Sequence, residues 1–167
     1  MRNFLNFMKN TKLKNAILLI FLLFLYVFIS VQSYVNAVSE NISNAVFRLH
    51  VLANSDSEED QSLKIKVRDE LLKYMNSISS NCTTKEEAIS VAESHKEEFQ
   101  KIAENTIKEN GYDYSVKINI GNFYFPTKNY GDISLPAGLY DALRVEIGEA
   151  KGQNWWCVMF PSLCFID

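Results

Sequence analysis

Residues 45–75 decide the fold of this chain, and they read AVFRLHVLANSDSEEDQSLKIKVRDELLKYM. The opening residues 45–53 are rich in Val, Leu and Phe, which favours a β-strand with Arg48 and His50 on the opposite parity. The polar residues 54–57 then offer several helix caps, and the acidic residues 58–60 suit the positive end of a helix dipole. We therefore predict a strand over residues 45–53, followed by a helix over about residues 58–75.

The apolar side chains of this predicted helix gather on one arc at helical spacing. The arc consists of Leu63, Val67, Leu71, Tyr74 and Met75. Lys64 and Arg68 fall at its rim. From there they could pair with a carboxylate or reach a partner.

A second helix is indicated further along the chain. Thr84 and Glu87 have the spacing of a capping box, and Gly111 is a suitable C-terminal stop. The helix between them would present an apolar face that includes His95, which we expect to be a core or interface histidine. Its other members are Ala88, Val91, Ala92, Phe99, Ile102 and Ala103.

The remainder of the sequence is typical of β-structure. Apolar and polar residues alternate over residues 116–120, and further strands are predicted at residues 140–147 and 155–160. A loop through Gly148 and Gly152 joins the last two strands, which we expect to form a hairpin with a long connection. The predicted fold class is α+β, with two helices packed on a mostly antiparallel sheet in a single domain.

An N-terminal signal or anchor precedes this domain. Four basic residues and no acidic residue lie before position 15, and residues 16–29 are an uninterrupted apolar run. Small residues around position 37 then indicate a signal-peptidase site between Ala37 and Val38. Because the uncharged stretch extends over residues 15–39, an uncleaved membrane anchor is the alternative. We therefore divide the chain into a signal peptide or anchor (1–37) and an exported domain (38–167).

The charge balance excludes one class of partner. All 20 acidic residues but only thirteen of the 17 basic residues follow position 37, so residues 38–167 carry a net charge of −7. Binding to nucleic acid depends on cationic contacts to phosphate. We expect no nucleic-acid partner.

The C-terminal tract, NWWCVMFPSLCF at residues 154–165, holds both tryptophans and two of the three cysteines. So many bulky apolar groups must be buried or form a contact surface. A turn near residues 160–161 could bring Cys157 and Cys164 opposite each other as a disulfide. The alternative is two small buried thiols.

Residues with catalytic or metal-binding spacing are not found in the sequence. His50 and His95 lack the spaced Cys and His companions of a zinc site, and no serine lies in a nucleophile elbow. We therefore expect no cofactor, no metal and no enzymatic activity.

Three blocks of the sequence are long and unusual in composition, namely RLHVLANSDSEEDQSLK at residues 48–64 with the following VRD at 67–69, LPAGLYDALRVEIG at 135–148, and NWWCVMFPSLCFID at 154–167. Together they resemble the stage II sporulation protein R family of endospore-forming bacteria. Ser162 stands where the family usually has a second proline, Ala150 where glycine is common, and Gln153 where histidine is frequent. Many relatives also continue past the position of Asp167, which bears on the stability of the last strand.

The resemblance implies a signalling function. Proteins of this family are made in the forespore and exported into the space between forespore and mother cell. There they activate a membrane-embedded aspartic peptidase that processes pro-sigma-E. The chain would thus be a ligand that contacts the membrane only through its N-terminal segment.

Aromatic and arginine side chains tend to dominate binding interfaces, which selects the candidate contacts of this chain. The candidates of these types are Trp155, Trp156, Tyr140, Arg144 and Arg68, and the turn with Asn54 and Asp56 is a further candidate. Two other functions stay open. One is an exported hydrolase of cell wall or peptide that uses His50, Asp56 or Glu58, and the other is a membrane-anchored adaptor.

Overall fold

The computed structural model describes residues 11–131 and 133–162, and the chain divides into two compact units, residues 1–40 and 41–167. Helix α2 (Thr11–Ala45) makes up the described part of the first unit and runs into the second. Its segment Thr11–Val35 is long and apolar enough to cross a membrane, and none of it is buried in the protein. The predicted cleavage site between Ala37 and Val38 falls inside this helix and stays a prediction.

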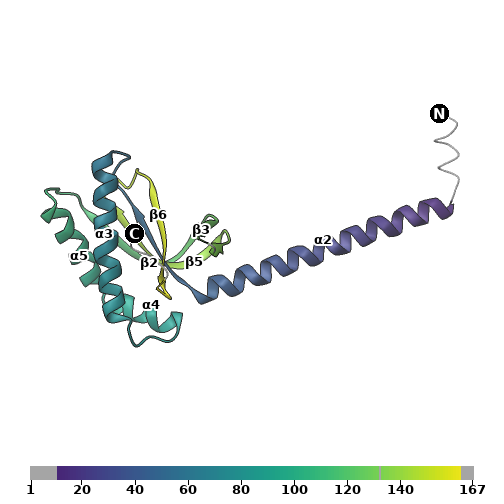
Figure 1. Ribbon diagram of the computed structural model, residues 1–167, viewed down its shortest axis with the longest axis horizontal. Coiled ribbons are helices and arrows are strands. Elements are labelled where there is room, and N and C mark those ends of the chain that lie inside the picture. The colour runs from purple at the N-terminus through teal and green to yellow at the C-terminus, as the bar shows by residue number, and fades with distance from the viewer. Residues whose placement is uncertain (1–10, 132, 163–167) are drawn as a thin grey trace. The chain divides into compact units, whose positions relative to one another are not determined.

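The second unit has both helices and strands, which confirms the predicted α+β class (Figure 1). In chain order it contains β1 (Phe47–Leu52), α3 (Glu58–Ile78), α4 (Lys85–Ser94), α5 (Lys96–Glu109), β2 (Val116–Phe125), β3 (Lys128–Tyr130), β4 (Ile133–Leu135), β5 (Gly138–Ile147) and β6 (Asn154–Phe160). Four strands form one sheet in the order β2-β5-β1-β6, and β3 pairs with β4 in a separate hairpin. The sheet is mostly antiparallel, since only the β1–β5 pair is parallel.

Both predicted helix starts are confirmed by their caps. The Ser57 hydroxyl accepts from the Asp60 backbone N–H at the start of α3, and Thr84 forms a full capping box with Glu87 at the start of α4. Each cap satisfies a backbone donor that the first turn of a helix leaves without a partner.

The predicted single helix after residue 84 is wrong, because it breaks at His95 into α4 and α5. The carbonyl oxygen of Val91 accepts from the Ser94 hydroxyl at 2.8 Å and lies 2.9 Å from Nδ1 of His95. Side chains that bond the preceding turn in this way compete with the helical backbone pattern. His95 therefore ends α4 and precedes α5, instead of lying at the centre of one apolar face.

The predicted hairpin between β5 and β6 is also wrong, because β1 lies between them. His50 of β1 is in register with Arg144 of β5 on one side and with Trp156 of β6 on the other. All six residues of β1 are buried, as expected for a strand with neighbours on both edges.

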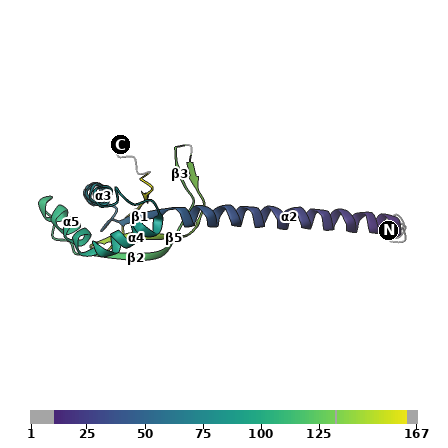
Figure 2. The same ribbon diagram turned by 90° about the horizontal axis from the view of Figure 1, so that it is seen from below.

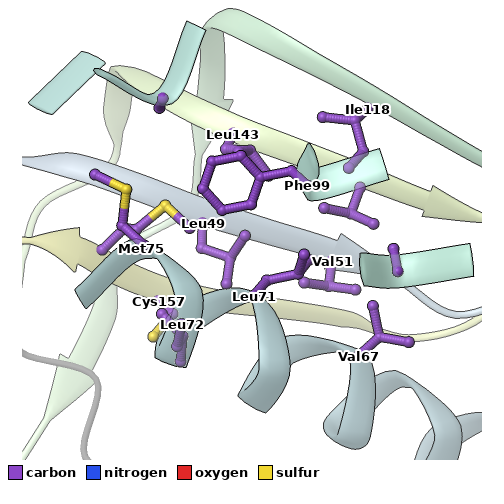
Figure 3. Packing of buried hydrophobic residues seen from close by; sticks show 14 of the residues in the cluster. Leu49, Val51, Val67, Leu71, Leu72, Met75, Phe99, Ile118, Leu143 and Cys157 are labelled. Carbon is purple, nitrogen blue, oxygen red and sulfur yellow. The ribbon is translucent and has the colours of Figure 1, made fainter. Parts of the chain in front are cut away.

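The main core lies between the sheet and α3 and α5. Leu49 and Val51 of β1 point toward Leu71 of α3 and Phe99 of α5, and all four side chains are fully buried (Figure 3). Burying a side chain of this size stabilises the fold by about 1.5–3 kcal/mol. The arc predicted for α3 is therefore confirmed as its buried face.

A smaller core lies on the other face of the sheet. Because successive side chains of a strand point to opposite faces, Arg48 and His50 of β1 lie on this face. This core includes the β3–β4 hairpin, which stands out from the four-stranded sheet (Figure 2). Its buried apolar members are Val46, Phe125, Leu135, Tyr140, Ala142 and Val158.

Candidate functional site

The turn between β1 and α3 holds the loop that leads into β6. Asn54 donates from Nδ2 to Asp60 at 2.8 Å, and its Oδ1 accepts from the Glu149 backbone N–H at 3.0 Å. Asp56 Oδ1 accepts from the Gln153 backbone N–H at 2.7 Å. The two side chains predicted to contact a partner are thus hydrogen-bonded within the protein, where they position β6.

The carboxylate of Asp60 completes this turn. Burial alone would raise the pKa of Asp60, but hydrogen bonds from Ser55 and Asn54 outweigh it and hold the pKa below its ordinary value. The Ser55 hydroxyl donates to Asp60 at 2.6 Å. The charged carboxylate therefore ties the turn to the first residues of α3.

Two glycines let the loop approach the turn this closely. Gly148 has a φ of +57°, and a Cβ there would overlap the side chain of Asn54. A Cβ on Gly152 would overlap the backbone carbonyl of Ser55. Only glycine fits both constraints without a shift of the backbone.

Strand β6 carries its two tryptophans to opposite faces of the sheet. Trp155 packs against the main core, where the guanidinium of Arg68 lies 4.3 Å from its ring centroid. Arg68 also pairs with Asp69 at 2.6 Å. Trp156 packs against the smaller core and stacks on His50, with 3.7 Å between ring centroids. Both tryptophans are half-buried, so each keeps a surface that a partner can reach.

An arginine without a carboxylate partner in the described part of the chain lies behind Trp156. Arg48 is fully buried, and its guanidinium lies 4.1 Å from the ring centroid of Phe125 and 4.7 Å from that of Tyr140. One terminal nitrogen donates to the Tyr130 hydroxyl at 2.6 Å, which in turn donates to the Trp156 carbonyl at 3.0 Å. Burial lowers the pKa of Arg48. The sequence placed Arg48 on this face but gave no sign of its burial.

The remaining candidates, Tyr140 and Arg144, lie on β5. Tyr140 is 1% exposed and donates its hydroxyl to the Pro136 carbonyl at 2.7 Å. Arg144 is half-buried and pairs with Glu146 at 2.8 Å. Tyr140 therefore belongs to the smaller core, whereas Arg144 keeps part of its surface in solvent.

A groove of about 760 Å³ runs along β6, and we call it the β6 groove. Residues of α3 and of the β3 region form its two walls, and residues at the start of β6 form its floor. It includes three of the predicted contact residues, Arg68, Trp155 and Trp156. Its described lining residues are Gln61, Lys64, Ile65, Arg68, Lys128, Asn129, Tyr130, Gly131, Gln153, Asn154, Trp155, Trp156 and Cys157.

The β6 groove is positively charged. It contains Lys64, Arg68 and Lys128, and none of its described lining residues is Asp or Glu. Lys64 is only 4% exposed, and its Nζ donates to Gln61 Oε1 at 2.5 Å and to the Gln153 carbonyl at 3.1 Å. Burial, with a smaller contribution from Arg68, lowers the pKa of Lys64.

The His, Cys, Asp and Glu side chains of the described residues are not grouped as metal ligands. No group of three His, Cys, Asp or Glu side chains among them could hold a metal ion. His50 Nε2 lies 2.7 Å from the amide oxygen of Asn154, and the ring stacks on Trp156. His50 is therefore positioned as a structural side chain.

The predicted disulfide extends beyond the described residues. Cys157 is buried, and Cys164 lies outside the described range. The pairing of these two cysteines stays a prediction. Cys82 is a half-buried free cysteine in the connection between α3 and α4.

Comparisons with known proteins agree on one family. Residues 43–167 match the family described as Stage II sporulation protein R. A protein named Stage II sporulation protein R from Bacillus subtilis (strain 168) is 41% identical over 126 residues, which cover 75% of this chain and 56% of that protein. The chain thus spans little more than half the length of this relative. No solved structure matches this chain significantly.

The family match covers all of the second unit except its first two residues, so this chain belongs to the stage II sporulation protein R family and has a role in sporulation.

Proposed function

We propose that this protein is made in the forespore, exported across its membrane, and there activates the membrane-embedded aspartic peptidase that processes pro-sigma-E. The observation that carries the proposal is the family membership of residues 43–167. The apolar segment Thr11–Val35 supports export, because a signal or anchor of this kind directs a chain into the membrane.

The geometry of the second unit favours a ligand over an enzyme. Its β6 groove is lined by cations, amides and aromatic rings, which suit binding. The buried His50 is stacked against Trp156 and bonded to an amide. We therefore propose that the domain acts by binding and has no catalytic activity of its own.

Binding activates a peptidase only if the active form is bound more tightly than the inactive form. A shift from 1% to 99% active peptidase needs a difference of about 5.5 kcal/mol in binding free energy. A few desolvated aromatic and cationic anchors can supply energies of this size at an interface. Trp155, Trp156 and Arg68 are such anchors on one groove.

Co-expression in a non-sporulating host tests the proposal. The full chain, the peptidase and pro-sigma-E are expressed together, and processing of pro-sigma-E is followed by immunoblot. We expect processing only when both the chain and the peptidase are present. A peptidase with a substituted catalytic aspartate is the matched control, since it separates activation of the peptidase from cleavage by this chain. Processing that persists without this chain would contradict the proposal.

A further inference from the structure

We propose that the β6 groove binds an extended, carboxylate-bearing segment of the peptidase, which adds as a fifth strand to the edge of β6 opposite β1. This inference rests on the proposed function, because it specifies how the partner is bound. It commits to one chemistry for the occupant, namely a polypeptide in β conformation with Asp or Glu side chains.

The floor of the groove is a strand edge. β6 is the last strand in the order β2-β5-β1-β6, and in the described part of the chain it pairs only with β1. Half of the backbone groups of such a strand point away from its neighbour and can pair with another chain. The groove therefore lies along the outer edge of the first four residues of β6, 154–157, where the Trp156 carbonyl already accepts from Tyr130.

Both walls already bond backbone carbonyls at this edge. Lys64 of α3 donates to the Gln153 carbonyl at 3.1 Å, and Tyr130 of β3 donates to the Trp156 carbonyl at 3.0 Å. These carbonyls thus face the groove. A helix on one side, a hairpin on the other and an open strand edge between them are suited to β-strand addition, in which the backbone gives affinity and side-chain pockets give specificity.

The charge of the groove selects the occupant. Residues 38–167 carry a net charge of −7, yet the groove gathers Lys64, Arg68 and Lys128 without a described carboxylate. Asp69 compensates Arg68 from outside the groove, whereas neither lysine has an ion pair with a described residue. A carboxylate in the groove would therefore meet the ammonium groups of Lys128 and of Lys64, on which Asp56 already acts from outside the groove lining, while the rest of the acidic surface would repel it.

The same charges argue against a second copy of this chain as the occupant. Two copies that paired edge to edge through β6 would bring Lys64 and Lys128 of one copy close to those of the other. Like charges that face each other across an interface cost several-fold in affinity. The buried indole Nε1 of Trp155 has no acceptor among the described residues. This unpaired donor favours a ligand rich in hydrogen-bond acceptors over a second copy of the chain.

Photo-crosslinking in the co-expression system tests the inference. A benzophenone amino acid replaces Asn129, an exposed residue of the groove wall, in the full chain. The matched control places it at Lys117, an exposed residue of β2 at the opposite edge of the sheet. We expect the groove position to form an adduct with a peptidase segment that contains Asp or Glu, and the control position to form none.

A dose–response of pro-sigma-E processing supplies the second measurement. We expect Lys128→Glu to need about tenfold more protein than the wild type for half-maximal processing, because it places a carboxylate against a carboxylate. Lys64→Gln should also raise the amount of protein needed for half-maximal processing, while Lys117→Glu should need the same amount as the wild type. Circular dichroism compares the folding of each variant, and Lys128 keeps the test decisive if Lys64→Gln fails to fold, since Lys128 is only half-buried.

Several outcomes would overturn the inference. They are an adduct with a second copy of the chain, with its own residues 163–167, or with a peptidase segment that has no carboxylate. A Lys128→Glu protein that folds and processes at the wild-type dose would do the same and leave the proposed function standing. If the wild type gives no processing at all, the proposed function itself fails.

Discussion

Gly152 lies where the loop after β5 passes the turn before α3, and its lack of a side chain lets the two backbones touch. Its backbone N–H donates to the Ala53 carbonyl at 3.0 Å. A Cβ at this position would overlap the Ser55 carbonyl, and a backbone atom of a bonded turn cannot move aside cheaply. This loop fixes the position at which β6 begins. A methyl group at position 152 would therefore affect the residues that form the floor of the β6 groove.

We predict that Gly152→Ala lowers the free energy of unfolding by about 1–3 kcal/mol, as overpacking does in tight interiors. Urea unfolding followed by tryptophan fluorescence measures the change. Gly121→Ala is the matched control, because a Cβ on Gly121 would make only ordinary contacts, at 3.8 Å from the Phe123 ring. Equal unfolding midpoints for the two variants would contradict the prediction.

At the scale of elements, β6 joins the two cores because neighbouring residues of a strand point to opposite faces. His50 of β1 lies under Trp156 on one of these faces. Burial lowers the pKa of His50 from 6.5 to about 4. The hydrogen bond to Asn154 and the charge of Glu146 oppose this shift, and the charges of Arg144 and Arg48 add to it. The histidine is therefore neutral in the folded protein at pH values where the unfolded chain binds a proton.

The sign of the pH dependence follows from this difference. Above about pH 6.5 both states are neutral at His50 and the full stability is present. As the pH falls toward 4, protonation of the unfolded chain removes up to about 3 kcal/mol from the free energy of unfolding. We predict that His50→Gln abolishes this loss between pH 6.5 and 4, as measured by urea unfolding at a series of pH values. Carboxylates with a lowered pKa, such as Asp60, change the free energy of unfolding at lower pH.

The parity of β6 gives a further prediction. Trp156→Ala removes the ring that covers His50, so water should reach the imidazole and raise its pKa back toward 6.5. Trp155→Ala is the matched control, since Trp155 packs on the other face. An NMR titration of the His50 ring protons separates the two variants. A His50 pKa that stays near 4 in Trp156→Ala would sink the prediction.

Local sequence signals predicted the helices and strands well, but they did not predict the contacts between segments that are distant in sequence. The caps at Ser57 and Thr84 and the apolar arc of α3 act within a few residues, so the sequence displays them directly. The break at His95 arises from two side chains that converge on one carbonyl, for which the sequence has no spacing rule. Which strand lies beside β6 depends on residues about a hundred positions away, and neighbouring strands in sequence were the wrong guess.

The site was predictable only in part for the same reason. The tryptophans and Arg68 were selected by residue type, and the fold brings them to one groove. Tyr140 was also selected by residue type, but it is buried in the smaller core together with the β3–β4 hairpin. The turn-rich residues 125–138 did not reveal this hairpin in the sequence. Arg48 was overlooked because arginine is rarely buried without a paired acid.

At the scale of the whole molecule, the proposed function depends on export through the N-terminal segment. A lysine at the centre of a membrane-spanning helix costs about 2.5–3.5 kcal/mol on insertion scales. We predict that Leu22→Lys combined with Leu25→Lys prevents insertion of Thr11–Val35, so that the chain leaves the membrane fraction and is shielded from external protease in intact cells. The pair Leu22→Ala and Leu25→Ala is the control and should still insert. Surface exposure of the double-lysine chain would count against a targeting role for this segment.

The position of β1 in the sheet has a consequence for the order of folding. β1 ends at residue 52, but both of its neighbours come from residues 138–160. Such long separations in sequence slow folding, since a long loop must close before any strand pairing rewards it. The ribosome therefore makes β1 early, and both edges of this strand keep their backbone N–H and C=O groups unpaired until residues 138–160 have emerged. During that interval the segment FRLHVL exposes apolar side chains and unpaired strand edges together, which makes it prone to aggregation.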